Sequence, residues 1–190
     1  MALDFGMFPP ADERDDPLSN SGVVSALSSS GFIQSIQYGS VTITEVTNTA
    51  VLTTEVVTSN SVVMLLGLRN SISGGTPDSF LSNVILTNGS TVTSTRYDNN
   101  GTAYVDFCVI EFQPGILKSK QIGSSSESSA SIVEVDITKT VVFSKGAITT
   151  YDADNVDGMI FSVSLTDSTT VATTVSRAGT TIYFVVLEFN

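Results

Sequence analysis

The chain has 190 residues, a formal net charge of −11 and no histidine, with 8 Lys and Arg against 19 Asp and Glu. So few basic residues cannot build the positive patch that nucleic-acid binding requires, which excludes that class of partner. The lack of histidine excludes Ser-His-Asp and Cys-His nucleophilic centres and removes the commonest metal ligand. The one cysteine excludes an intrachain disulfide and the cysteine-rich zinc sites.

The composition predicts an all-β protein. Apolar residues make up 41% of the chain and charged residues only 14%, against about 25% in an average soluble domain. Val, Ile, Thr, Phe and Tyr favour strands, and Ser and Thr dominate the polar residues. The first residues carry no basic start and no apolar signal core, and no apolar run reaches the ~20 residues of a membrane span. We therefore expect synthesis in a cytoplasm without export by the ordinary route and without a membrane partner.

Residues 1–30 differ from the rest of the chain and are expected to form an extended acidic arm. Residues 8–17 contain prolines and carry a net negative charge, which is typical of a segment without its own core. The segment nevertheless carries apolar residues that a free tail does not need. We expect these residues to anchor the arm on a capsid or another partner, and a neighbouring subunit is favoured over the arm's own domain. The expected anchors are Leu3, Phe5, Met7 and Phe8.

Strand signals begin at residue 31 and continue to residue 115. Two Asn-Gly pairs, at Asn88-Gly89 and Asn100-Gly101, punctuate this region, and Asn-Gly is the preferred pair of a type I′ hairpin turn. A Gly- and Pro-containing stretch at 69–79 predicts a long loop. Alternating or continuous apolar patterns predict strands at 32–38, 41–46, 51–57, 61–67, 81–87, 90–96 and 102–112.

The stretch Val84–Phe112 is repeated near the C-terminus. Leu86 and Leu165 lie 79 residues apart, whereas Glu111 and Glu188 lie 77 apart, which predicts a turn shorter by two residues in the second copy. Repetition at a fixed period predicts duplicated structural units.

The repeat divides the chain into four parts. We expect the 1–30 arm, a first β-sandwich at 31–115, a Ser-rich linker at 116–130 and a second sandwich at 131–190, both sandwiches antiparallel and in tandem. An OB-type barrel fits less well, because it usually carries a helix. The segment 116–130 is either a linker or a linker that runs into a polar first strand. Residues 32–46 have no convincing partner in the second copy, so its sandwich is expected to be shorter or to borrow a strand.

No pattern points to a catalytic site, so we expect a protein that is not an enzyme and needs no cofactor. The repeated carboxylates Glu111 and Glu188 each stand one residue before a strand's end, as structural residues do. Cys108 occupies the position of Val185 in the repeat and is predicted to be a small buried hydrophobe.

Two loops carry the remaining candidates for binding. The cluster Asp152, Asp154 and Asp157 has spacing that could suit Ca²⁺, although it does not match an EF-hand, and a solvated acidic loop is the favoured interpretation. Tyr97 and Tyr151 are candidates for ligand-facing loops, as aromatic platforms for sugar.

The block Leu86–Arg96, the ending Val109–Phe112 and the opening Ile36-Gln37-Tyr38-Gly39 resemble a repeat unit of tailed-bacteriophage virion proteins. The resemblance covers residues 32–113 well and 131–190 less well, because the second copy lacks the Ile-Gln-x-Gly opening. It implies β-sandwich units used in head decoration, head fibres or tail fibres, usually as homo-oligomers, with a trimer as one arrangement.

Two functions follow from this resemblance. The first is a capsid decoration, cement or head-fibre protein of the virion, anchored by its N-terminal arm and first domain and partnered by a capsid or other virion protein. The second is a tail-fibre or receptor-binding module that recognises host surface carbohydrate. The extended arm favours the first, because cementing needs segments that span neighbouring subunits.

Overall fold

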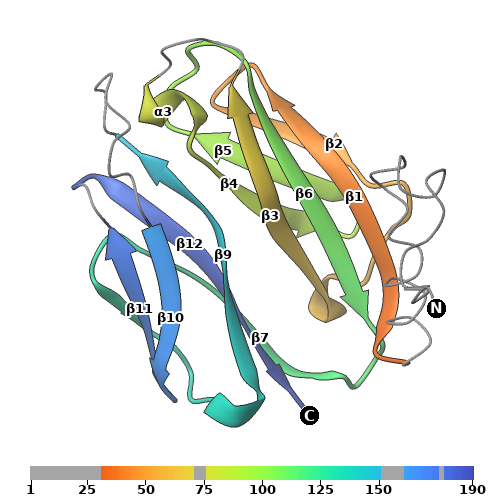
Figure 1. Ribbon diagram of the computed structural model, residues 1–190. Coiled ribbons are helices and arrows are strands. Elements are labelled where there is room, and N and C mark those ends of the chain that lie inside the picture. Colours follow the sequence, from red (N-terminus) through yellow and green to blue (C-terminus); the bar gives the residue numbers. More distant parts are fainter. Residues whose placement is uncertain (1–30, 71–75, 151–160, 176–177) are drawn as a thin grey trace, which may run out of the picture.

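The computed structural model describes residues 31–70, 76–150, 161–175 and 178–190, and these residues form an all-β structure (Figure 1). The arm 1–30, with Leu3, Phe5, Met7 and Phe8, lies outside the described residues, as does the stretch 151–160, with Tyr151 and the three aspartates.

The first six strands form one unit, made of the antiparallel three-stranded sheet β1-β6-β3 and the strands β2-β5-β4. A 3-10 turn, η1 (Thr58–Asn60), precedes β3, and a single helical turn, α3 (Pro77–Phe80), precedes β4. The strands are β1 (Ile33–Ile43), β2 (Thr47–Val51), β3 (Ser61–Asn70), β4 (Ser82–Asn88), β5 (Thr91–Arg96) and β6 (Ala103–Phe112).

The last six strands repeat this connectivity as a second unit. The order β7-β12-β9 corresponds to β1-β6-β3, and β8-β11-β10 corresponds to β2-β5-β4. The turn η2 (Ile137–Lys139) corresponds to η1. The strands are β7 (Leu117–Ser125), β8 (Ser129–Ser131), β9 (Thr140–Thr149), β10 (Phe161–Asp167), β11 (Thr170–Val175) and β12 (Thr180–Phe189).

The two units are joined edge to edge. The backbone of Asn83 on β4 pairs with Gly146 on β9, which makes one six-stranded sheet in the order β2-β5-β4-β9-β12-β7. Gly146 has a φ of 101°. A Cβ at this position would collide with the carbonyl oxygen of Ser82, so the junction needs glycine for both conformation and space.

Three apolar clusters hold the structure together. One fills the first unit, with Val41, Val84 and Phe107 among its buried members, and another fills the second unit around Phe184 and Val186. The third lies between the units and includes Val62, Phe112, Val185 and Leu187. Phe112 and Phe189, the last apolar residue of each repeat, meet edge to face with ring centroids 5.7 Å apart. The units are therefore packed against one another as well as paired through the sheet.

The segment predicted as a linker is part of the sheet. Residues 117–125 form β7 and pair along their length with β12, and 129–131 form β8. The Ser-rich composition did not indicate this edge strand, in which Ser119 bonds to Glu188, Ser124 is exposed and Gly123 leaves room for a ring. The alternative of a polar first strand is the closer description.

The second copy keeps the glutamine and glycine of the opening that it was predicted to lack, with Lys120 in place of the isoleucine. Ser35-Ile36-Gln37-Tyr38-Gly39 on β1 corresponds to Ser119-Lys120-Gln121-Ile122-Gly123 on β7, because Ile36 pairs with Ile110 and Lys120 with the equivalent Leu187. Both glycines leave room for a ring: a Cβ on Gly39 would lie 2.6 Å from the Phe107 ring, and one on Gly123 would lie 2.5 Å from the Phe184 ring. The offset is 84 residues here and 77 to 79 in the repeat described above, so the sequence comparison missed this match.

Three local predictions were wrong. The strand predicted at 51–57 lies earlier in the chain, as β2 at Thr47–Val51. Strand β1 runs through Gly39 without a break, so the predicted strands at 32–38 and 41–46 are one strand, Ile33–Ile43. The Asn88-Gly89 and Asn100-Gly101 turns are not type I′, because neither asparagine nor Gly89 has a positive φ. Gly89 is required instead for close approach, since a Cβ there would lie 2.6 Å from the carbonyl oxygen of Val56.

Candidate functional site

The repeated glutamates are buried polar anchors at the ends of β6 and β12. Glu111, 4% exposed, accepts hydrogen bonds from the Ser35 hydroxyl at 3.0 Å and from the Val57 amide at 2.8 Å. Each bond ties the last strand of the unit to another segment, β1 in the first case and the turn before β3 in the second. A buried carboxylate that accepts such bonds is costly to replace, because the donors would be left unsatisfied.

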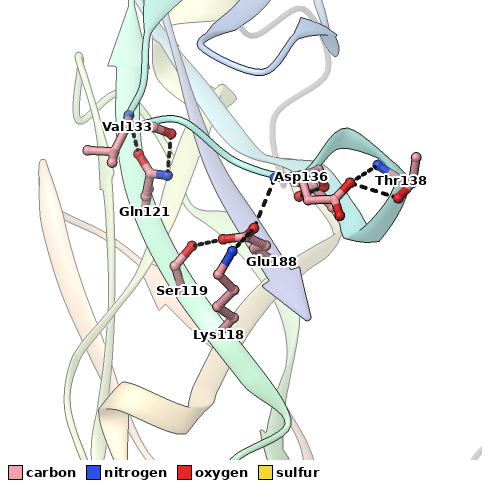
Figure 2. Close-up of polar contacts among 8 residues, drawn as sticks. Lys118, Ser119, Gln121, Val133, Asp136, Thr138 and Glu188 are labelled. Carbon is pink, nitrogen blue, oxygen red and sulfur yellow. Dashed lines mark hydrogen bonds and ion pairs between the residues drawn. The ribbon is translucent and has the colours of Figure 1, made fainter. Parts of the chain in front are cut away.

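Glu188 repeats this arrangement in the second unit and adds a cation (Figure 2). It accepts from the Ser119 hydroxyl at 3.1 Å and the Asp136 amide at 2.9 Å, and it pairs with the Lys118 ammonium at 2.7 Å. The Lys118 bond, followed by the Asp136 amide bond, lowers the pKa of Glu188 below its usual value. The carboxylate is thus held in its charged form as a structural link between β12, β7 and the turn that leads to η2.

The turn that donates the Asp136 amide bond is itself capped. The Asp136 carboxylate accepts from the Thr138 amide at 3.0 Å and from its hydroxyl at 2.7 Å, which starts η2 (Figure 2). The bonds from Thr138 lower the pKa of Asp136. In the first unit the equivalent residue is Val57, so the second unit has a more polar form of the same corner.

In each unit a glutamine side chain links the first strand to the backbone of a neighbouring segment. The Gln121 side chain on β7 donates to the Val133 carbonyl at 2.9 Å and accepts from the Val133 amide at 2.7 Å (Figure 2). Gln37 on β1 makes the same pair of bonds with Thr54, at 2.8 and 2.9 Å. The amide imitates one rung of a β-ladder, so it links the first strand to the segment that follows the second strand.

An open groove of about 380 Å³ lies beside this glutamine in the second unit. It runs between β7 and β8, which are edge strands of two different sheets. Phe184 lies among its lining residues, and on its rim Ile122 is 58% and Val133 74% exposed. A volume in this range suits a ligand or a peptide segment, and edge strands offer unpaired backbone groups. This groove is therefore a candidate binding surface within the described part of the chain.

The far end of the first unit is organised by a buried arginine. Arg96, 1% exposed, donates to the backbone carbonyls of Glu45 at 3.1 Å and Gly101 at 2.7 Å, and also to that of Ser79. Burial lowers its pKa. The guanidinium therefore fixes three loops, and it does so with carbonyl dipoles rather than with a carboxylate. Tyr97, the next residue, is 54% exposed, and its role as a ligand-facing aromatic stays a prediction.

The remaining sequence candidates divide into two groups. Cys108 is buried, 6% exposed, and burial raises the pKa of its thiol, which confirms the prediction of a small buried hydrophobe. The acidic cluster, Tyr151 and the arm anchors lie outside the described residues. Within the described part of the chain, no group of three or more Cys, Asp and Glu side chains is placed to hold a metal ion. No helix among the described residues is long and apolar enough to cross a membrane.

Sequence reasoning missed the glutamine and serine partners of the anchors. The signal was present as the Ser-x-Gln-x-Gly pattern of β1 and β7, but its different offset separated it from the repeat. Comparisons with protein-family models, with curated proteins and with solved structures found no match. The geometry describes two packed β units whose buried carboxylates hold backbone and whose exposed groove and loop end could contact another molecule.

Proposed function

We propose that this chain is a non-enzymatic structural protein of a tailed-bacteriophage virion, which decorates or cements the capsid. In this proposal each six-strand unit is an antiparallel β-sandwich domain, the N-terminal arm and first unit anchor the chain on the shell, and copies assemble as homo-oligomers. The phage assignment rests on the resemblance of residues 32–113 to virion repeat units. It requires no cofactor.

The observation that supports a structural role best is the repeated anchor. Glu111 is buried in the first unit and Glu188 in the second. The carboxylate of each accepts hydrogen bonds from a serine hydroxyl and a backbone amide. A group with this role stabilises strand ends and is not presented to a substrate. Because the units are also packed through a shared apolar cluster, they suit a rigid spacer that presents its surfaces to other virion proteins.

A capsid-binding assay tests the proposal. Purified shells from the phage that encodes the chain would be sedimented with the full protein and with a variant that lacks residues 1–30. The full protein should co-sediment at a fixed stoichiometry and the shortened variant should not. A melting curve of the shortened variant checks that it is folded. Equal binding of both proteins would sink the arm-anchor idea, and no binding of either would sink the decoration role.

The groove supplies the matched surface test. Ile122→Ser removes an exposed apolar residue from the rim of the groove, and Val51→Ser removes an 80% exposed one from β2 of the first unit. If the capsid contacts the second unit through the groove, only the first substitution weakens binding. If Ile122→Ser leaves binding unchanged, the contact is assigned to the arm and first unit alone.

The second candidate is a tail-fibre or receptor-binding module for host carbohydrate, and exposed Tyr97 beside the Arg96 loop cluster favours it. Sugars stack on such aromatic faces. A glycan array with the full chain should then give signals that Tyr97→Ala abolishes and Tyr38→Ala, at a 51% exposed tyrosine on β1, retains. An array without any signal at millimolar sugar would exclude this candidate.

A further inference from the structure

We propose that the junction between the two units binds one small monovalent anion of the halide class, held between the ammonium groups of Lys120 and Lys145. The site is independent of the capsid role, because it depends only on side chains within the junction.

The cavity that defines the site has a volume of about 20 Å³. It lies where β3 and β4 of the first unit meet β7, β9 and β12 of the second. Apart from the two lysines, its lining is apolar except for the buried Ser61. The lining residues are Ser61, Val62, Val63, Leu86, Lys120, Ile122, Lys145 and Val185.

Lys145 is the least expected residue of this lining. Its side chain is 2% exposed, and among the described residues it forms no hydrogen bond and no ion pair. An ammonium group taken out of water without a partner is strongly disfavoured. Three N–H donors and a positive charge are therefore available to a guest in the cavity.

Lys120 brings a second ammonium group to the same cavity from β7. It is partly buried, and it donates to the backbone carbonyls of Thr58 and of Ser61, the latter at 3.0 Å. These bonds cross from the second unit to the first and leave one N–H donor. No carboxylate of the described residues pairs with Lys120, so the two cations share a site without a counter-charge.

Comparison of the two units shows that the fold itself does not require lysine here. Leu65 faces Phe107 and Ser144 faces the equivalent Phe184, so the bulge residue Leu66 corresponds to Lys145. Leu66 is 55% exposed although it is apolar, whereas Lys145 is buried although it is charged. Lys120 likewise corresponds to Ile36. The second unit thus carries lysines at both positions where the first unit carries aliphatic residues.

The volume of the cavity and the positive charge of its two lysines decide which ion it can bind. A cavity of this volume holds about one water-sized particle, which excludes phosphate, sulfate and carboxylates. A water could accept hydrogen bonds but could not offset the charge. Burial, and after it the Lys120 charge, lowers the pKa of Lys145 to about 8. The pKa is lowered because no negative charge lies beside the two ammonium groups. A halide removes this penalty, since it accepts hydrogen bonds from both ammonium groups and neutralises one charge.

The test uses the full chain and bromide as the probe. Melting temperatures would be measured in sodium bromide and in sodium sulfate at matched ionic strength, and a crystal grown in bromide would be examined by anomalous scattering. We expect a saturable rise in melting temperature with bromide, against the non-saturating rise that sulfate gives any protein, and an anomalous peak between the two Nζ atoms.

Two variants make the result specific. Lys145→Leu installs the residue of the first unit, and its melting temperature should be independent of bromide. Lys139→Leu removes an exposed lysine of η2 and should keep the full response. A bromide response that survives in Lys145→Leu, a crystal with only water in the cavity, or a wild-type melting temperature that shows no saturable dependence on bromide would each overturn the proposal.

Discussion

The two units of this protein have the same connectivity but differ in where they bury charge. The first unit buries Arg96 under its loops, and the corresponding residue of the second unit is Val175. The second unit buries Lys145 at the junction, where the first unit has the exposed Leu66. Both keep the glutamate, serine and glutamine that hold the strand ends. Backbone anchors are thus common to the two copies, and the buried cations distinguish them.

Arg96→Val, which copies the second unit, tests the largest of these differences. The substitution removes the donors to the carbonyls of Glu45, Ser79 and Gly101 and leaves them in a closed site. We expect a loss of about 3–5 kcal/mol in the free energy of unfolding, because each unsatisfied buried group is costly. Urea unfolding measures this loss. Arg69→Val, at an exposed arginine of the same unit, is the control, and equal losses would contradict the role assigned to Arg96.

Gly146→Ala and Gly67→Ala compare the two units at one bulge. Gly146 has a positive φ and no space for a Cβ, whereas a Cβ on Gly67 would meet only Asp106, at 3.9 Å. We expect Gly146→Ala to cost about 2–4 kcal/mol, from backbone strain and overpacking, and Gly67→Ala to be close to neutral. Thermal unfolding separates the two. A mild effect of Gly146→Ala would mean that the pairing of β4 with β9 is loose.

Glu111→Gln and Glu188→Gln compare the two anchors. Glu111→Gln should cost about 1–3 kcal/mol, because an amide keeps the shape but loses the charge-assisted bonds. Glu188→Gln should lower the melting temperature further, since Glu188 has a third partner in Lys118. The opposite order would show that Lys118, 57% exposed, adds nothing to the anchor.

The second anchor also gives the protein an acid-sensitive component. The folded-state pKa of Glu188 lies below its unfolded value, so its contribution to stability is complete above the unfolded pKa and is lost as pH falls through the folded pKa. The melting temperature of the native chain should therefore decrease as the pH is lowered below about 4. In Glu188→Gln the slope should be shallower, and parallel profiles would contradict this assignment.

The smallest expected effect concerns an ion pair that the second unit lacks. Arg69 pairs with Asp106 at 3.0 Å and lies over the Tyr104 ring, with its guanidinium carbon 5.1 Å from the centroid. The arginine is 61% exposed, so Arg69→Ala should lower the melting temperature only slightly, and by less still at high salt. Melting curves at low and high sodium chloride measure both. A salt-independent loss would assign the effect to the ring contact.

Much of the architecture follows from the sequence alone. Strand-forming residues, the Thr-Val-Thr alternation and the 79-residue repeat predicted antiparallel β structure in two copies, and Cys108 was correctly placed in the interior. These features are local, because alternation decides which residues share one face of a strand. The prediction failed where composition misled, at the Ser-rich β7, and where chain offset changed, at the Ser-x-Gln-x-Gly openings.

Only the tertiary structure decided what covers each face. The 79-residue repeat places Lys145 and Leu66 at equivalent positions, but it does not say that one of them meets the neighbouring unit and the other meets water. The same holds for Glu111 and Glu188, whose partners come from segments far away in the chain. Sequence periodicity fixes the direction of a side chain relative to its own strand, whereas burial depends on the packing of distant segments against it.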